Sequence, residues 1–192
     1  MKRGLLKVCL GGLMLAGTWA FAGDPTNGRK IANMCRTCHG LNGFAQIPIA
    51  PHIGGEPKEY LEAQMLAFKT GTREHEIMTI VAGGLSVEQI ADVAAWYASH
   101  TATATLPTDA NVEDAPDACV SCHGANGISE VPDAPNLAGE VNVYIATQLK
   151  DFRSGKRQHV VMTAIASELN DDEIRDFADW YAAIELQIAT GK

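Results

Sequence analysis

Apolar and polar positions follow one another along this chain with the period of amphipathic helices. Two capping boxes, Ser86–Gln89 and Asn170–Glu173, each mark a helix N-terminus. The helices that follow carry apolar residues on one face at i, i+3, i+4 and i+7: Ile90, Val93, Ala94 and Tyr97, and Ile174, Phe177, Ala178 and Tyr181. A second amphipathic pair covers 60–68 and 144–152, with Gly71 and Gly155 as stop signals. Because no stretch shows sustained period-two alternation, the pattern predicts an all-α fold.

The helices come in matching pairs because the sequence contains an internal repeat. When Cys35 is placed on Cys119, the segment 35–98 aligns with 119–182 without a gap and with 27 identities in 64 positions. A repeat of this length indicates duplication of a structural unit. We therefore predict two domains, 23–100 and 113–192, joined by a linker at 101–112 that is small, polar and contains Pro107.

Residues 1–22 follow a different pattern. A basic start is followed by the apolar stretch Val8–Thr18 and by the small-x-small sequence Ala20-Phe21-Ala22, which is typical of a secretory signal peptide. The alternative is a membrane anchor, but the apolar stretch is shorter than the ~20 residues of a spanning helix. We expect cleavage before Gly23, export to the periplasm, and no transmembrane segment after cleavage.

Both aligned segments begin with the pentapeptide Cys-x-x-Cys-His. Two thiols at this spacing can add to the two vinyl groups of a haem, and the adjacent histidine can ligate the iron. The pattern predicts two covalently bound haem c groups, with Cys35, Cys38, Cys119 and Cys122 as attachment residues and His39 and His123 as proximal iron ligands. A zinc ribbon would need two Cys-x-x-Cys knuckles brought together, whereas the repeat places one in each domain.

Met78 and Met162 each follow the proximal histidine of their own unit at the same offset in sequence. A methionine pair at one shared offset predicts the distal iron ligands. The alternative is bis-histidine ligation by His75 and His159, which lie three residues earlier. The favoured interpretation of these histidines is solvation or hydrogen bonding near the haem edge.

Other residues are placed around the predicted haems by their position. Pro51 and Pro135 also follow the proximal histidines at one shared offset, where a backbone carbonyl can accept the imidazole N–H. Four further repeated residues are candidates for binding haem propionates, with surface charge and interface packing as the equally weighted alternative: Arg73, Arg157, Tyr60 and Tyr144. His52 and His100 have no counterpart in the other half, and we expect them at the surface.

Iron with both axial positions filled by protein has no open position for a substrate, and methionine ligation raises the potential. The sites therefore predict an electron carrier that works by outer-sphere transfer, not an enzyme. Residues 23–104 carry 6 basic and 8 acidic side chains, a balance of −2, whereas 105–192 carry 6 and 15, a balance of −9. The electric field of this negative charge attracts basic partners and repels nucleic acid. An equally weighted alternative is that the acidic residues only increase solubility.

These motifs resemble class I cytochrome c domains: Cys-x-x-Cys-His-Gly, the proline that follows it in both units, a Gly-Glu/Tyr/Gln/Phe/Gly/Arg series, and His-x-x-Met before the last helix. Two such domains after a signal peptide resemble the dihaem cytochrome c4 family. The resemblance implies two domains packed about a pseudo-twofold axis with haem propionate edges facing one another. It also implies periplasmic electron transfer from a donor such as a dehydrogenase or flavoprotein to a terminal oxidase or another cytochrome.

The resemblance leaves other functions to weigh. The strongest alternative is the cytochrome subunit of a flavocytochrome c sulfide dehydrogenase, which is also an exported dihaem protein. A dihaem peroxidase needs a haem that opens a coordination position, and here both have a methionine. A thiosulfate-oxidising cytochrome with a cysteine distal ligand needs a spare cysteine, and the one cysteine outside the two motifs, Cys9, lies in the predicted signal peptide.

The two units differ at their N-terminal ends. Residues 27–32 are predicted to form a helix that packs on the last helix of the first unit, with Gly28 allowing close contact. The aligned segment 111–116 has Val112 in place of that glycine and ends in Pro116, so its helix is expected to be shorter or to start late. We therefore expect the second haem to be the more exposed or less rigidly held one.

Overall fold

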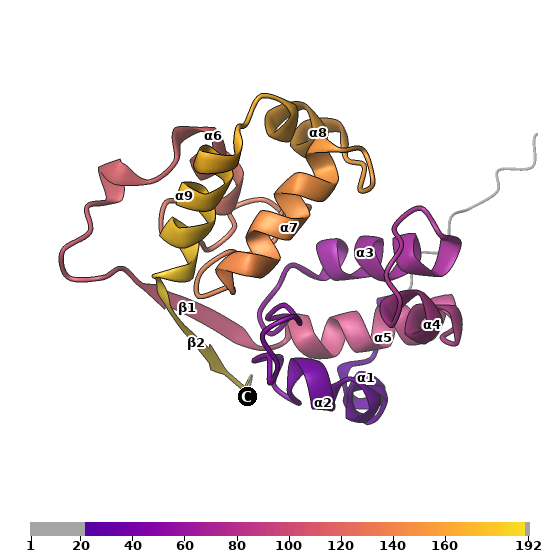
Figure 1. Ribbon diagram of the computed structural model, residues 1–192. Coiled ribbons are helices and arrows are strands. Elements are labelled where there is room, and N and C mark those ends of the chain that lie inside the picture. Colours follow the sequence, from indigo (N-terminus) through magenta and orange to yellow (C-terminus); the bar gives the residue numbers. More distant parts are fainter. Residues whose placement is uncertain (1–21, 191–192) are drawn as a thin grey trace, which may run out of the picture.

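The computed structural model describes residues 22–190 as two helical units that meet along a shared face, with a two-stranded sheet beside them (Figure 1). The first unit contains α1 (Pro25–Ile31), the 3-10 helix η1 (Ala32–Met34), α2 (Arg36–His39), α3 (Lys58–Thr70), α4 (Met78–Gly83) and α5 (Val87–Ala98). The second contains η2 (Val112–Asp114), α6 (Asp117–His123), α7 (Asn142–Arg153), α8 (Val160–Ser167) and α9 (Asp171–Ala182). The predicted signal peptide falls almost wholly on residues 1–21, outside the described part.

The predicted helix signals are present as local structure. Both capping boxes form: Ser86 and Gln89 exchange side-chain-to-backbone hydrogen bonds at the start of α5, and Asn170 and Glu173 do so at the start of α9. Gly71 ends α3 in the left-handed conformation at φ 77°. The predicted apolar faces of α5 and α9 are buried, except that Phe177 is half-buried. No helix within 22–190 is both long enough and apolar enough to cross a bilayer.

The first unit has an additional contact at its N-terminal end, as predicted. Helix α1 lies against α5 with Gly28 at the crossing, where an added Cβ would lie 1.9 Å from the Asp92 carbonyl oxygen. The Asp92 carboxylate accepts hydrogen bonds from the Asp24 backbone N–H (2.7 Å) and the Asn27 amide (2.8 Å). In the second unit the segment aligned with α1 forms only the 3-10 helix η2, and α6 begins after Pro116, because proline is tolerated at a helix start but not inside one.

Strands β1 (Thr101–Thr105) and β2 (Glu185–Ala189) were not anticipated from the pattern, and β1 lies in the segment predicted as linker. They pair antiparallel, and the central pair joins Thr103 to Gln187, its own counterpart in the repeat. The pseudo-twofold axis between the units therefore passes through this pair. The signal of β1 was weak because alternating Thr and Ala differ little in hydrophobicity, and β2 alternates polar and apolar residues over only five positions.

Candidate haem sites

The two Cys-x-x-Cys-His motifs occupy equivalent places in the two units. The first runs into the short helix α2, and the second forms the end of α6. Successive cysteines of a motif are one helical turn apart, so they lie on one side of the helix. All four thiols are free and half-buried, as attachment to a haem requires. The His39 and His123 side chains are only 8% and 5% exposed.

A glycine follows each proximal histidine because the chain must turn sharply there. Gly40 has φ 71°, and an added Cβ would lie 2.3 Å from the Phe44 carbonyl oxygen. Its own carbonyl accepts a hydrogen bond from the buried Tyr97 hydroxyl (3.2 Å), and Gly124 accepts the equivalent bond from Tyr181 (3.2 Å). The tyrosine of the last helix therefore fixes the loop that leaves each haem motif.

One ring nitrogen of each proximal imidazole is engaged in a hydrogen bond to the backbone. His39 Nδ1 lies 2.9 Å from the Pro51 carbonyl oxygen, and His123 Nδ1 lies 2.8 Å from that of Pro135. A carbonyl only accepts, so Nδ1 carries the proton and Nε2 keeps its lone pair. Burial lowers the pKa of both histidines, which favours the neutral form that a metal ligand must have. The two hydrogen bonds expected from the shared histidine-to-proline spacing are thus present.

Met78 begins α4 and Met162 lies in the first turn of α8, and both side chains are half-buried. His75 Nδ1 accepts the Met78 backbone N–H (3.3 Å), and His159 Nδ1 accepts that of Met162 (3.3 Å). The two histidines thus hold the helix starts that carry the methionines, which agrees with the hydrogen-bonding interpretation. Met162 also borders the same apolar core as Cys119.

The four propionate candidates lie at the interface between the units. Arg73 donates to Gln64 (2.7 Å) and, across the interface, to Gln148 (2.7 Å) and Tyr144 (3.2 Å). The copy of this arrangement is complete, since Arg157 donates to Gln148 (2.7 Å), Gln64 (2.9 Å) and Tyr60 (3.3 Å). All four residues therefore make contacts at the interface, and their binding of haem propionates stays a prediction. Gln64 and Gln148 belong to this network although the sequence did not single them out as site residues.

The expectation that His52 and His100 lie at the surface was wrong. His100 is 5% exposed and bonds through Nδ1 to the Trp96 carbonyl (2.9 Å). His52 Nε2 lies 3.1 Å from the Gly139 carbonyl oxygen of the other unit, and its Nδ1 accepts the Ala45 N–H (2.9 Å). A residue without an identical counterpart can still fill an equivalent place.

Asn136 fills that equivalent place in the second unit. Its Oδ1 accepts the Ser129 N–H (2.9 Å), and its Nδ2 donates to the Gly55 carbonyl of the first unit (3.0 Å). An asparagine amide and a neutral imidazole both offer one acceptor and one donor at similar positions. The His52-to-Asn136 difference therefore preserves the interface contacts.

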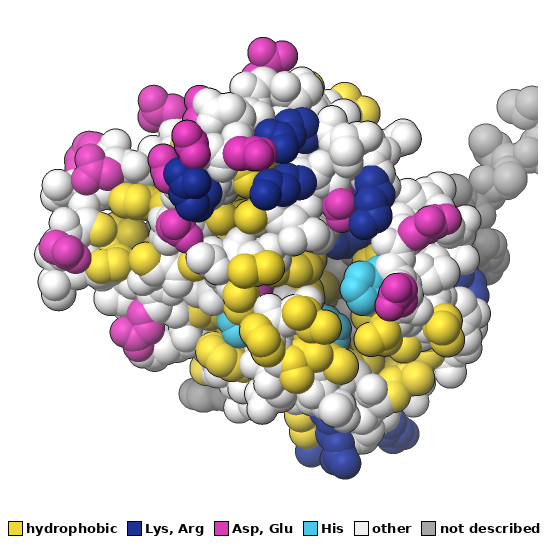
Figure 2. Space-filling model, viewed as in Figure 1, with side chains coloured by type: hydrophobic (Ala, Val, Ile, Leu, Met, Phe, Trp, Pro, Cys, Tyr) yellow, Lys and Arg dark blue, Asp and Glu magenta, His cyan; other side chains and the backbone are white. Residues whose placement is uncertain are grey.

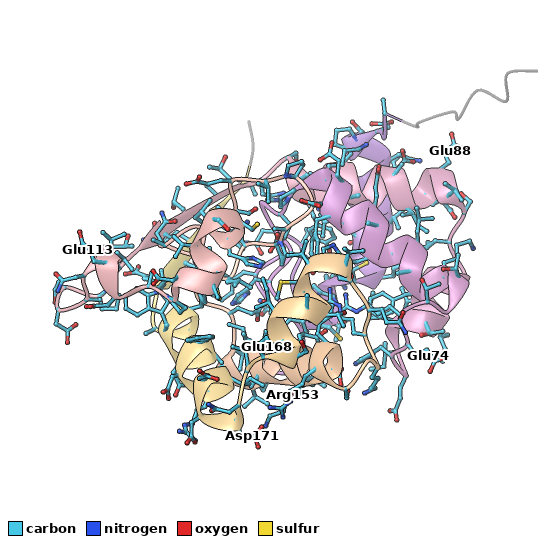
Figure 3. All side chains as sticks on the ribbon, turned by 90° about the horizontal axis from the view of Figure 1, so that it is seen from above. Glu74, Glu88, Glu113, Arg153, Glu168 and Asp171 are labelled. Atoms are coloured by element: carbon cyan, nitrogen blue, oxygen red, sulfur yellow. The ribbon has the colours of Figure 1, made fainter. Side chains whose placement is uncertain are left out.

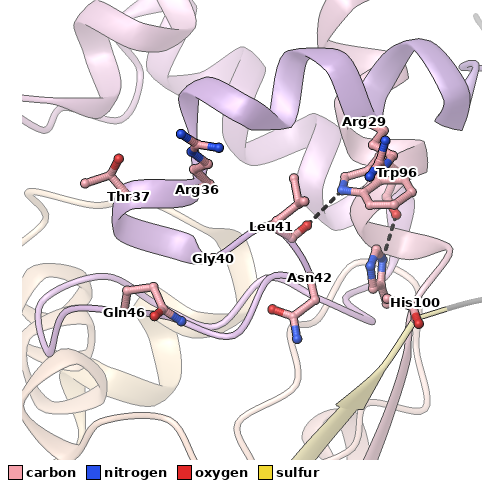
Figure 4. A pocket seen from close by; sticks show the side chains of 10 residues that line it. Arg29, Arg36, Thr37, Gly40, Leu41, Asn42, Gln46, Trp96 and His100 are labelled. Carbon is pink, nitrogen blue, oxygen red and sulfur yellow. Dashed lines mark hydrogen bonds between the residues drawn. The ribbon is translucent and has the colours of Figure 1, made fainter.

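A pocket of about 680 Å³ flanks the first motif (Figure 4). Arg29, Arg36, Trp96 and His100 are among its lining residues, and Trp96 Nε1 donates to the Leu41 carbonyl at its wall (3.0 Å). Neither His39 nor Met78 lines it. The pocket thus borders the first motif at Arg36 and Thr37 but not at the proposed iron ligands, so the donor atoms and not this pocket locate the haem site.

The donor set fits two covalent haems better than a zinc ribbon. Each unit offers two free thiols one turn apart and a neutral imidazole with Nε2 available. Within residues 22–190, no three His, Cys, Asp or Glu side chains are grouped as a metal cage would require.

Two haem-motif domains related by a pseudo-twofold axis define a dihaem c-type cytochrome. No protein-family model matches the chain. The cytochrome c4 of Azotobacter vinelandii is 32% identical over 188 residues, which span 84% of this chain and 90% of that protein. The chain belongs to the cytochrome c4 family.

Two further likenesses agree with this membership. Crystalline reduced recombinant cytochrome c4 from Pseudomonas stutzeri matches with a TM-score of 0.72 at 26% identity, over 85% of this chain and 100% of that one. The thiosulfate dehydrogenase electron acceptor of Thiomonas intermedia is 29% identical over 206 residues, 97% of this chain and 93% of that protein. The protein is therefore a dihaem electron-transfer protein with two covalent haem c groups, not an enzyme in its own right.

Proposed function

We propose that this protein carries electrons between redox proteins of the periplasm by outer-sphere transfer. In this proposal His39 and Met78 ligate the first iron and His123 and Met162 the second, within domains 23–100 and 113–192. Residues 1–22 act as the export signal. The observation that carries the proposal is the pair of Nδ1 hydrogen bonds to Pro51 and Pro135, which leaves each Nε2 free for iron.

The chain's own residues prepare each site for fast electron exchange. When bound, each haem would supply a one-electron couple, held by the two cysteines, the histidine and the methionine of its unit. The carbonyl partner holds the imidazole in one orientation and raises its basicity as a ligand. The Arg73 and Arg157 networks hold the two units in one relative placement, so transfer between the sites needs no domain rearrangement.

The surface charge favours a basic partner surface. Figure 2 shows acidic side chains gathered over the second unit, while apolar side chains and histidines lie together lower on the same face. Glu113, Glu168 and Asp171 lie on the second unit in Figure 3, where Asp171 pairs with Arg153 (2.6 Å). The excess of acidic groups there agrees with the balance of −9 for residues 105–192.

A second candidate function is that of a dedicated electron acceptor for a dehydrogenase of sulfur compounds. It is favoured by the Thiomonas intermedia relative, which is named as a thiosulfate dehydrogenase electron acceptor. The cytochrome subunit of a flavocytochrome c sulfide dehydrogenase is another form of this role. A dehydrogenase or flavoprotein that stays bound during purification would favour the second candidate over a free carrier.

The test of the proposed function is a redox-poised visible spectrum of the purified protein, including the weak far-red band that reports methionine bound to ferric iron. We expect two haems per chain and loss of about half of that band in each of Met78→Ala and Met162→Ala. Met65→Leu is the matched control, because Met65 lies half-buried on α3 and should leave the band intact. A band that survives both alanine substitutions would contradict the ligand assignment.

A further inference from the structure

Two glutamates are buried at the interface although a buried carboxyl group is costly unless it is hydrogen-bonded. Glu56 is 5% exposed and its repeat counterpart Glu140 is 4% exposed. Burial raises the pKa of Glu56 well above its usual range and that of Glu140 to about 7, and hydrogen bonds from backbone N–H groups oppose this rise. The interface thus retains a charged residue type at the same place in both copies.

Each glutamate accepts a hydrogen bond from a backbone N–H of the other unit. Glu140 Oε2 accepts the His52 N–H (2.9 Å), and Glu56 Oε2 accepts the Asn136 N–H (2.8 Å). These are contacts over 88 and 80 residues of sequence. The remaining oxygen of Glu140 accepts the Val141 N–H (2.9 Å), so both oxygens of this carboxyl group are held.

The N–H groups that the glutamates accept belong to the peptide units that also hold the proximal histidines. The Pro51–His52 peptide donates its N–H to Glu140 and accepts the His39 Nδ1 proton on its carbonyl. The Pro135–Asn136 peptide does the same between Glu56 and His123. One peptide unit therefore links a carboxyl group of one domain to the proximal imidazole of the other.

A series of hydrogen bonds of this kind transmits the effect of a charge from one end to the other. An anionic acceptor at the N–H end draws the proton towards it and increases electron density on the carbonyl oxygen, because hydrogen bonds in a chain polarise one another. A stronger acceptor at Nδ1 makes the imidazole a better donor to iron and favours the ferric state. Removal of the carboxylate should therefore favour the ferrous state of the haem in the opposite domain.

We propose that Glu140 tunes the potential of the first haem through Pro51–His52 and His39, and that Glu56 tunes the second haem through Pro135–Asn136 and His123. Both are positioning residues that act through a ligand. The inference rests on the proposed iron ligation. It makes the interface part of each redox site, because the potential of each haem depends on the carboxyl group that the partner domain contributes.

The test is a redox titration of the holoprotein at pH 8.5, followed by NMR of the ligand methionine methyl groups. Met78→His and Met162→His variants assign each signal to its haem. Glu140→Gln keeps the shape and one acceptor oxygen and removes the charge. We expect it to shift the ferric-to-ferrous ratio of the first haem about threefold towards ferrous, roughly 28 mV for a one-electron couple, and to leave the second haem unchanged.

Glu56→Gln should show the crossed result, a shift of the second haem towards ferrous with the first haem unchanged. Glu113→Gln removes one exposed charge in η2 and controls for the change in net charge. We call the path from carboxyl group through peptide unit to proximal imidazole the relay. If Glu140→Gln shifts the potential of the haem in its own domain, shifts both potentials equally, or shifts neither, the relay is refuted. A wild-type protein without two methionine-ligated haems would instead refute the proposed function, so the two failures are distinguishable.

Discussion

The contact between α1 and α5 depends on the absence of a side chain at Gly28. A Cβ at this position would lie 1.9 Å from the Asp92 carbonyl oxygen, 2.6 Å from the Asp92 carbonyl carbon and 2.9 Å from the Trp96 Cβ. Two of these atoms belong to the helix backbone, which cannot rotate away. Gly28→Ala must therefore move α1 away from α5.

The magnitude follows from three effects of different sign. Overpacking against backbone costs about 1–3 kcal/mol. Separation of the helices also weakens the hydrogen bonds from Asp24 and Asn27 to Asp92, each worth about 1 kcal/mol. Alanine gains back about 1 kcal/mol over glycine in helix propensity. We expect Gly28→Ala to destabilise the protein by about 2–3 kcal/mol.

The assay is guanidinium unfolding of the holoprotein followed by far-ultraviolet circular dichroism. Gly83→Ala is the matched control, because Gly83 also lies in a helix but no atom lies within 4 Å of its added Cβ. Gly83→Ala should be neutral or slightly stabilising, since only the propensity effect of at most about 1 kcal/mol remains. If the two variants unfold within about 0.5 kcal/mol of each other, the close-approach explanation for Gly28 is wrong.

Two further predictions concern the interface. Arg157→Met should lower the free energy of unfolding by about 2 kcal/mol because it removes the part-buried hydrogen bonds of Arg157 to Gln148, Gln64 and Tyr60, whereas Arg175→Met, an exposed control, should change it by less than about 0.5 kcal/mol. Equal effects of the two would contradict the network. The raised pKa of Glu140, about 7 against an ordinary 4.5, means that its proton stabilises the fold below pH 4.5 and that this contribution, about 3 kcal/mol at most, is lost as pH rises through 7. Unfolding curves of wild type and Glu140→Gln from pH 4 to 8 should therefore diverge with rising pH. His52, whose pKa burial lowers, is common to both proteins, whereas the pKa of Glu56, which Glu140 helps to raise, falls in the variant and adds to the divergence; parallel curves would contradict the shift.

Periodicity and spacing were sufficient for most of what lies inside one unit. The capping boxes placed the starts of α5 and α9, and the histidine-to-proline spacing placed the proline carbonyls beside the imidazoles. These signals work because helix caps and short loops are decided by residues close in sequence. The late start of α6 after Pro116 followed from the same local reasoning.

Contacts between the units could not be found in this way. Glu140 meets His52 over 88 residues of sequence, and no periodicity reports on how two copies are placed relative to each other. A usable signal was nevertheless present, since a glutamate follows a glycine at the same place in both units. Those glycines, Gly55 and Gly139, have positive φ values of 77° and 66° and bring the loop close to strands β1 and β2.

The symmetry of the relay limits where a difference between the two haem potentials can arise. Both proximal histidines have the same carbonyl partner and the same crossed carboxyl group, so these contacts affect the two irons alike. The units differ instead at His52 against Asn136, and at the N-terminal helix, where Asp92 is held by α1 while its counterpart Asp176 is exposed. The relay itself carries an effect only from the Glu56 or Glu140 carboxyl group to the iron of the opposite domain. Exchanging His52 and Asn136 would therefore separate the contribution of these two side chains to the difference between the haem potentials from the contribution of the N-terminal helix.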